Sequence, residues 1–317
     1  MSPPSFEDIV AAGRRIKDQV RRTPVVTHET LNEALACEAW CKCESLQDTG
    51  SFKLRGASNA VLHLRELGVG AEVATHSSGN HGAALARAAR QDGRQAFVVM
   101  PDNAVPAKIA AVRAQGAEVI LCEPTQSARE AGLARLVDQG LVPIPPYDHP
   151  DIIAGQGTAA LELLEEKGDL EILMTPVGGG GLVSGAAIAA HGLNPHIRVF
   201  GAEPEGAADT AASLRQGSRV AEWKPDTIAD GLRALVGKLT FQIIQDREVR
   251  VLTVSEQGII DGMELVWDTL EMAIEPSSAT VIAAIREHPE HFRGRRVGLV
   301  FSGGNVDRNQ YSFFAGS

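Results

Sequence analysis

Four consecutive glycines follow an apolar run in the second half of the chain. In EILMTPVGGGGLVSGAAIAAHG, an expected strand leads into Gly178, Gly179, Gly180 and Gly181, and an Ala-rich helical pattern follows. Residues without side chains let the main chain approach an anion closely, and their N–H groups and the following helix N-terminus favour phosphate. Because a tight turn needs only one or two glycines, four in a row predict a phosphate site.

Missing motifs narrow the kind of phosphate. The sequence has no GxxxxGK[ST], so the P-loop of nucleoside-triphosphate enzymes is excluded. The dinucleotide pattern GxGxxG fails as well, because its last position would fall on Val183 or Ser184. A small phosphorylated cofactor is the class that remains.

One lysine has the surroundings that imine chemistry requires. TGSFKLRG places Lys53 beside Phe52 in a glycine-flanked turn that enters an expected helix. A lysine that forms an imine must be partly neutral, and desolvation lowers a lysine pKa from about 10.4. Most lysines are solvated surface groups, so Lys53 becomes a candidate only together with the glycine loop.

Two polar loops also follow expected strands. THSSGNHG offers the hydroxyls of Ser77 and Ser78, the amide of Asn80 and the ring of His81 at a helix N-terminus. This set suits a substrate carboxylate, and an ordinary helix-capping loop is the alternative. RRVGLVFSGGN ends a strand at Ser302, whose hydroxyl would leave a facing pyridine nitrogen neutral, whereas an aspartate would keep it protonated.

The elements that position these residues alternate along almost the whole chain. Short β-rich runs are followed by Ala-rich helical segments, which is typical of βαβ units and parallel sheets. Ligands of such sheets bind at the carboxyl ends of the strands, where all four motifs fall. The proline-rich stretch 143–151 (PIPPYDHPD) is the best candidate for a crossing between domains.

In this order, the motifs resemble the fold-type II pyridoxal-phosphate enzymes, and most closely the serine/threonine dehydratase and serine racemase group. The matching segments are SFKLRGASNA, SSGNHG, IAGQGT, PVGGGG, EPEGAAD, TIADGL, IEPSSA and SGGNVD, which run from residue 51 to 307. The resemblance implies an α/β fold with two open, twisted, mainly parallel sheets flanked by helices. It also implies a large cofactor-binding domain (1–65 and 150–317) and a small substrate-loop domain (66–149).

The resemblance assigns a role to each matching residue. Lys53 would hold pyridoxal phosphate covalently, and Phe52 would pack beside the ring. Asn80 would hydrogen-bond the 3-hydroxyl of the cofactor, and Ser302 would face its pyridine nitrogen. The phosphate would be bound by Gly178, Gly179, Gly180 and Gly181, and the substrate by Ser77, Ser78, Asn80 and His81.

Three further positions concern the metal and the substrate. Glu203, Ala207 and Asp209 in EPEGAAD resemble the divalent-cation site of the family, and oxygen ligands imply Mg²⁺, Ca²⁺ or Mn²⁺. A solvated acidic loop is the alternative. Arg129 matches a family arginine that can face a second substrate carboxylate, and an exposed helix arginine is the alternative.

The implied activity is that of a lyase that eliminates water and then ammonia from a β-hydroxy amino acid of the L-threonine or L-serine type. The alternatives are an L-threo-3-hydroxyaspartate dehydratase, or a serine racemase with dehydratase side activity. Ser78 keeps racemisation open, because family racemases carry a serine base there and dehydratases often carry alanine. A β-replacement synthase and a binder without catalysis are weaker interpretations.

Composition narrows the possible partners and cellular location of the protein. The formal net charge of −10 argues against nucleic acid or an anionic membrane surface as a partner. Neither a long apolar run nor a signal-peptide pattern occurs, so we expect a cytoplasmic enzyme, and the resemblance implies a homodimer or larger homo-oligomer. Four cysteines make no disulfide framework, and we expect Cys37, Cys41 and Cys43 to be buried thiols. Only twelve residues follow Asn305, so no C-terminal amino-acid-sensing domain is expected.

Overall fold

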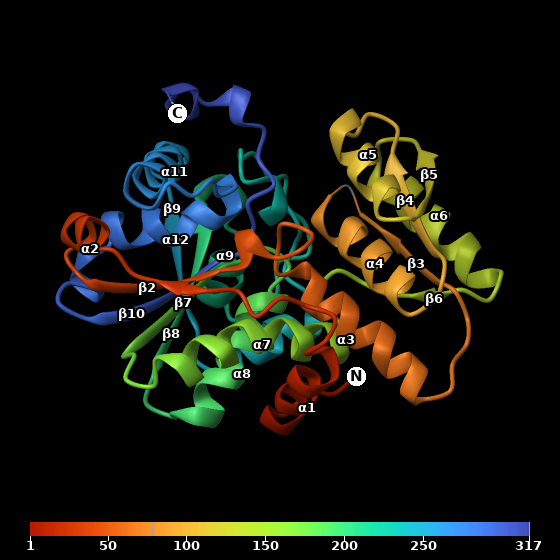
Figure 1. The fold of residues 1–317 in the computed structure, drawn as a ribbon, viewed down its shortest axis with the longest axis horizontal. Coiled ribbons are helices and arrows are strands. Elements are labelled where there is room, and N and C mark those ends of the chain that lie inside the picture. Colours follow the sequence, from red (N-terminus) through yellow and green to blue (C-terminus); the bar gives the residue numbers. More distant parts are fainter. Residues whose placement is uncertain (78, 317) are drawn as a thin grey trace.

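The computed structural model describes residues 1–77 and 79–316, and these residues form two open sheets with helices on their faces (Figure 1). The larger sheet has the strand order β1-β2-β10-β7-β8-β9 and the smaller one β5-β4-β3-β6. The strands are β1 (Val25–Val26), β2 (Glu38–Cys43), β3 (Val73–His76), β4 (Ala96–Pro101), β5 (Glu118–Cys122), β6 (Val142–Pro143), β7 (Ile172–Pro176), β8 (Arg198–Pro204), β9 (Arg250–Val254) and β10 (Arg296–Phe301).

Strand pairing is parallel except between β1 and β2. Central strands such as β7 are buried along their whole length, because helices cover both faces of a parallel sheet. The predicted fold class, two mainly parallel sheets flanked by helices, is confirmed. β1 was not predicted, because Val25 and Val26 lie between Pro24 and polar residues and not in a β-rich run.

Twelve α-helices connect and cover these strands in the described residues. They are α1 (Phe6–Ile16), α2 (Glu29–Leu35), α3 (Lys53–Glu66), α4 (Asn80–Gln91), α5 (Pro106–Ala114), α6 (Gln126–Asp138), α7 (Pro150–Glu166), α8 (Gly181–Leu193), α9 (Asp209–Gln216), α10 (Lys238–Asp246), α11 (Glu256–Leu270) and α12 (Pro276–Glu287). The stretch 143–151 is the loop from β6 into α7, whose first residue is Pro150.

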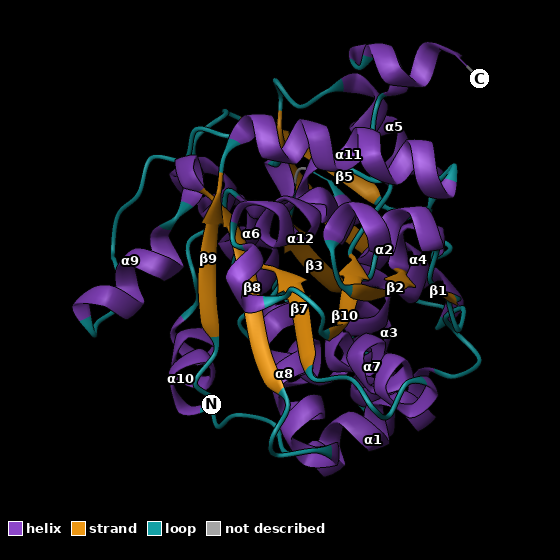
Figure 2. Cartoon of the chain, turned by 90° about the vertical axis from the view of Figure 1, so that its left-hand side faces the viewer, coloured by secondary structure: helices purple, strands orange, loops and turns teal. Residues whose placement is uncertain are grey.

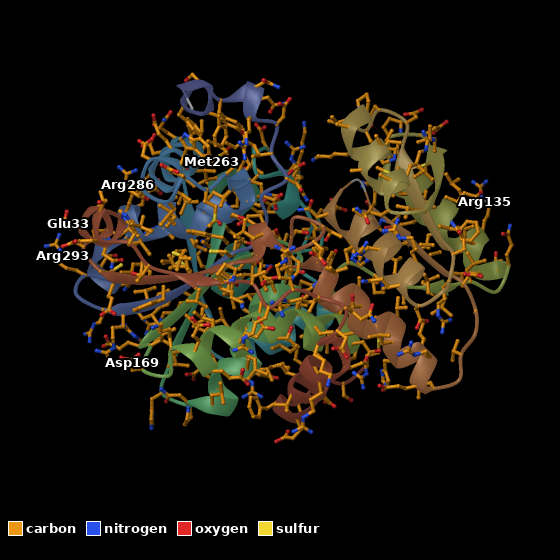
Figure 3. The ribbon with its side chains drawn as sticks, in the orientation of Figure 1. Glu33, Arg135, Asp169, Met263, Arg286 and Arg293 are labelled. Atoms are coloured by element: carbon orange, nitrogen blue, oxygen red, sulfur yellow. The ribbon has the colours of Figure 1, made fainter. Side chains whose placement is uncertain are left out.

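The larger sheet lies between two helical layers (Figure 2). α2, α11 and α12 pack on one face, where Met263 of α11 is fully buried (Figure 3). α1, α7, α8 and α10 cover the other face. α7 and α8 approach closely through two glycines: a Cβ on Gly157 would lie 2.7 Å from the Gly185 carbonyl oxygen, so only glycine fits there. This contact fixes α8 directly behind the glycine loop.

The smaller sheet packs against α3, α4 and α5 on one side and α6 on the other. The α3 side chains Leu54, Ala57 and Val61 belong to this core together with Ile152 of α7, so α3 lies where the two parts of the molecule meet. All strands of the smaller sheet fall within residues 66–149, and the division into two domains stays a prediction.

Two further observations concern membranes and thiols. No helix in the described ranges is long and apolar enough to cross a bilayer. Cys37, Cys41 and Cys43 are buried free thiols, as predicted, and burial raises the pKa of each.

Candidate active site

Lys53 and Ser302, far apart in sequence, are brought together at the start of α3. The Phe52 N–H donates to the Ser302 carbonyl oxygen at 2.9 Å, and Ser51 forms an isolated β-bridge with Gly303. Lys53 is the first residue of α3, so this helix begins next to the residues that follow the carboxyl end of β10. The candidate imine lysine therefore lies at the sheet edge where parallel folds bind ligands.

The environment of Lys53 lowers its basicity. Its Nζ donates to the Pro146 carbonyl oxygen at 2.8 Å and lies 5.0 Å from the centre of the Phe52 ring. Burial lowers the pKa of Lys53 to about 8, and the negative charge of Glu275 opposes that shift. A fraction of the amines is therefore neutral at physiological pH, as imine chemistry requires.

The glycine loop links β7 to α8 and is built for an anion. Gly180 has φ +87°, which an L side chain rarely adopts, and a Cβ on Gly179 would overlap the Tyr147 ring. None of the N–H groups of residues 178–181 donates to an acceptor within the described part of the chain. Four free donors at the N-terminus of α8 fit a cofactor phosphate.

Asn80 is the first residue of α4 and is tied to a carboxylate that sequence reasoning missed. Its Nδ2 donates to both oxygens of Glu275 at 3.0 Å, and its Oδ1 accepts from Asn305 Nδ2 at 2.9 Å. Burial raises the pKa of Glu275 to about 7. The signal in the sequence was a lone acid directly before Pro276 at a helix start, inside the matching segment IEPSSA.

Ser302 is buried at the end of β10. Its Oγ lies 3.1 Å from Ser278 Oγ, and Ser278 also bonds the N–H and the carbonyl oxygen of Gly303. Sequence reasoning missed Ser278, whose hydroxyl fixes the turn that presents Ser302. The contact of the Ser302 hydroxyl with a pyridine nitrogen stays a prediction.

The predicted substrate loop lies at the N-terminus of α4. Ser77 Oγ accepts from the N–H groups of Gly79 and Gly82, so it caps the loop and keeps its own proton for donation. His81 Nε2 lies 3.0 Å from the Ile144 carbonyl oxygen, and burial lowers the pKa of His81 to about 3, so the ring is neutral. Ser78 lies outside the described residues.

Arg129 lies in the first turn of α6 and is half-buried. Its Nη2 donates to Gln126 Oε1 at 2.7 Å, and no carboxylate of the described residues forms an ion pair with it. His76 lies at the carboxyl end of β3, and its pKa is lowered first by its own burial and second by the positive charge of Arg129. Arg129 is therefore a free cation near the strand end that leads into the substrate loop.

The predicted cation ligands lie at the carboxyl end of β8 and just after it, since Glu203 is in the strand and Asp209 begins α9. Glu203 is fully buried and accepts from the N–H groups of Thr210 and Ala211, and Asp209 accepts from the Val236 N–H. The pKa of Glu203 is raised to about 8, mainly by burial and also by the charge of Asp209. Two buried, mutually repelling acids fit a divalent cation. Within the described residues no group of three or more His, Cys, Asp or Glu side chains could hold a metal, so the site stays a prediction.

Comparisons with known proteins agree with this geometry. The family model described as "Pyridoxal-phosphate dependent enzyme" matches residues 16–303. The chain is 46% identical to a serine racemase of Dictyostelium discoideum over 98% of both proteins. It is 43% identical to a β-hydroxyaspartate dehydratase of Paracoccus denitrificans, covering 96% of this chain and 97% of the relative.

Solved structures give the same result. The crystal structure of the D. discoideum racemase has a TM-score of 0.90 and covers 96% of this chain and 99% of its own. The crystal structure of a threonine deaminase from T.th. has a TM-score of 0.91 at 41% identity, with 96% and 99% coverage. Taken together, these proteins support the alternative expectations, hydroxyaspartate dehydratase or serine racemase, better than the threonine or serine dehydratase expected first.

Proposed function

The chain belongs to the fold-type II pyridoxal-phosphate enzymes, in the group of serine racemases, threonine deaminases and hydroxyaspartate dehydratases, and from that membership we propose that it dehydrates a 3-hydroxyaspartate. The observation that carries the proposal is Arg129, a half-buried cation with no carboxylate partner among the described residues. A guanidinium binds a carboxylate with two parallel hydrogen bonds, which suits a substrate with a second carboxylate.

The residues of the site fit pyridoxal phosphate. The free N–H groups of residues 178–181 would bind its phosphate, Phe52 would pack on the ring, and Ser302 would face the pyridine nitrogen. Asn80 would share its amide between Glu275 and the 3-hydroxyl. When bound, the cofactor supplies an electron sink that stabilises negative charge at the substrate Cα.

Lys53 is the base for the Cα proton in this proposal. Its pKa of about 8 lets it accept and release a proton near neutral pH. The Pro146 carbonyl oxygen, 2.8 Å from Nζ, stabilises the protonated amine and keeps it oriented. The neutral hydroxyl of Ser302 would leave the pyridine nitrogen of a bound cofactor unprotonated.

The two carboxylates of the substrate would be bound at two different places. The N-terminus of α4 and the hydroxyls of Ser77 and Ser78 bind the α-carboxylate. Arg129 binds the distal carboxylate from the direction of His76. A lost hydrogen bond to a charged group costs about 1.5–3 kcal/mol, which corresponds to roughly 10- to 150-fold in kcat/KM between dicarboxylate and monocarboxylate substrates.

Serine racemisation is the second candidate. Ser78 stands where family racemases carry the base opposite the lysine, and the D. discoideum relative is a serine racemase. A serine hydroxyl on that face would return a proton to Cα and invert its configuration. L-threonine or L-serine dehydration ranks behind both candidates, and β-replacement ranks last.

A divalent cation at Glu203, Ala207 and Asp209 is part of the proposal. Glu203 is held by the N–H groups of Thr210 and Ala211 in the first turn of α9, and Asp209 is held by the Val236 N–H, so a cation between the two acids would stabilise this part of the fold. Oxygen ligands favour Mg²⁺, Ca²⁺ or Mn²⁺.

A substrate panel tests the function. The purified enzyme is supplied with L-serine, L-threonine and both 3-hydroxyaspartate diastereomers, and keto acid, ammonia and D-amino acid are measured. We expect the highest kcat/KM for keto-acid formation from a 3-hydroxyaspartate. Faster formation of D-serine than of any keto acid would instead establish the racemase, and Ser78→Ala should then abolish D-serine and spare elimination.

A further inference from the structure

Four charged side chains are buried together behind the first turn of α3. Arg55 of α3, Glu44 after β2, Lys42 of β2 and Glu162 of α7 form a charge cluster with two cations and two anions. The side chains of Lys42, Glu44 and Arg55 have no exposed surface, and that of Glu162 is 16% exposed. The cluster thus joins two separate segments, residues 42–44 and α7, to the helix that begins with Lys53.

Every N–H group of the Arg55 guanidinium has an acceptor in the cluster. Nε and Nη2 donate to the two oxygens of Glu44, both at 2.8 Å. Nη1 and Nη2 donate to the two oxygens of Glu162, also at 2.8 Å, and Nη1 reaches Thr158 Oγ1 at 3.2 Å. Each of the two carboxylates accepts a pair of hydrogen bonds from a different side of the planar guanidinium, so the group is held in one orientation.

Lys42 and Thr23 complete the cluster. Lys42 Nζ donates to Glu162 at 2.6 Å and to the Thr23 carbonyl oxygen at 2.7 Å, and the Thr23 hydroxyl donates to Glu44 at 2.5 Å. The summed formal charge is zero. Burial and Glu275 are the causes that shift the pKa of Lys53, and the cluster is not among them. Its effect on Lys53 is therefore one of geometry.

Stability alone is a weak reason for such a cluster. The desolvation of buried ions offsets most of their attraction, and well-packed apolar residues often stabilise a fold as well or better. What the cluster adds to the apolar packing of α3 is direction, because the planar fork of Arg55 accepts only one orientation between two carboxylates. Residues two apart on a helix point to opposite sides, so Arg55 is held on one side of α3 while Lys53, on the other side, reaches the Pro146 carbonyl oxygen.

We propose that the charge cluster sets the rotation of the first turn of α3, and that Arg55 is a positioning residue for Lys53. The inference rests on the proposed role of Lys53 as the residue that holds pyridoxal phosphate. A misplacement of about 1 Å is enough to lower a rate about 100-fold, so a looser Arg55 should reduce turnover without changing substrate binding.

The test compares Arg55→Lys with Leu170→Ala in the holoenzyme. A lysine at position 55 keeps the positive charge and loses the paired hydrogen bonds of the guanidinium. Leu170 is a buried residue just before β7, at the opposite end of the sheet from the site, and its truncation should also lower thermal stability. For Arg55→Lys we expect kcat to fall about 100-fold with KM within about threefold of wild type. The visible circular dichroism per bound cofactor, which reports a fixed ring orientation, should fall by at least half.

Leu170→Ala should keep both the wild-type kcat and the dichroism at a temperature where it is folded. If Arg55→Lys does not fold, Glu162→Gln keeps the shape of the cluster and removes one charge, and it should give the same pattern at a smaller amplitude. Equal losses in the control, or unchanged dichroism in both cluster variants, would overturn the inference. A wild-type protein that attaches no cofactor would overturn the proposed function first, so the two failures are distinguishable.

Discussion

Attachment of pyridoxal phosphate to Lys53 should follow a pH dependence centred near 8. Only the neutral amine attacks the aldehyde of the cofactor, and burial lowers the pKa of Lys53 from 10.5 to about 8. With that pKa, about one tenth of the amine is neutral at pH 7 and about one hundredth at pH 6. A solvated lysine would be about 300-fold less neutral at pH 7.

The assay mixes cofactor-free protein with pyridoxal phosphate and follows the absorption band of the attached cofactor. The rate should rise about tenfold between pH 6 and 7 and level off above pH 8. Lys53→Ala should show no band. Because the carboxylate of Glu275 favours the charged amine, Glu275→Gln should move the midpoint below that of wild type.

A midpoint near 10 in the wild-type protein would refute the idea that burial prepares Lys53 for the reaction. A midpoint that rises in Glu275→Gln would show that the carboxylate does not act on the amine as its position implies. The glutamine variant keeps the shape of the side chain and one acceptor for Asn80, and it loses the second, because its amide nitrogen cannot accept a hydrogen bond.

Three other outcomes follow from the structure. Arg129→Ala should lower kcat/KM for 3-hydroxyaspartate about 10- to 100-fold and leave L-serine turnover within about twofold, as measured by steady-state kinetics. Arg135 is an exposed arginine on the same helix (Figure 3), and Arg135→Ala should change neither rate. Gly180→Ala should weaken pyridoxal-phosphate binding at least about tenfold in equilibrium dialysis, because φ is +87° there and the new Cβ would lie 2.8 Å from Thr240 Cβ. Mg²⁺ should raise the melting temperature of wild type and not that of Glu203→Gln/Asp209→Asn; a similar rise in both proteins would exclude this site.

Much of the fold was readable because its signals are local. The short β-rich runs of the sequence correspond to strands β2 to β10, since an apolar run bounded by turn residues indicates a buried strand. The glycine loop was readable for the same reason: its function needs the absence of side chains. Gly180, at positive φ, is the clearest case.

The parts of the site that could not be predicted depend on contacts between residues that are far apart in the sequence. Pro146 accepts a hydrogen bond from Lys53 through its backbone carbonyl, which no residue type announces. Glu275 acts through its burial against Asn80, 195 positions away in the chain. Tyr147 covers Gly179 only because the loop before α7 crosses the glycine loop, and that crossing is a property of the fold.

The buried charge cluster shows the same limit. Arg55 was part of a recognised motif, yet nothing in SFKLRG indicates that its side chain points away from the site. Its partners Glu44 and Glu162 come from segments without a chemical signature. Only the packing of α3 against the turn after β2 and against α7 brings them to 2.8 Å from Arg55. Sequence reasoning found the residue and could not find its role.

The most direct test is reduction of the holoenzyme with borohydride, followed by peptide mapping. Reduction makes the link between lysine and cofactor permanent, so the modified residue can be read from the mass of its peptide. We expect one pyridoxyl group per chain, on Lys53. Label on a different lysine, or a protein that carries no pyridoxal phosphate and still turns over its substrate, would contradict the central claim.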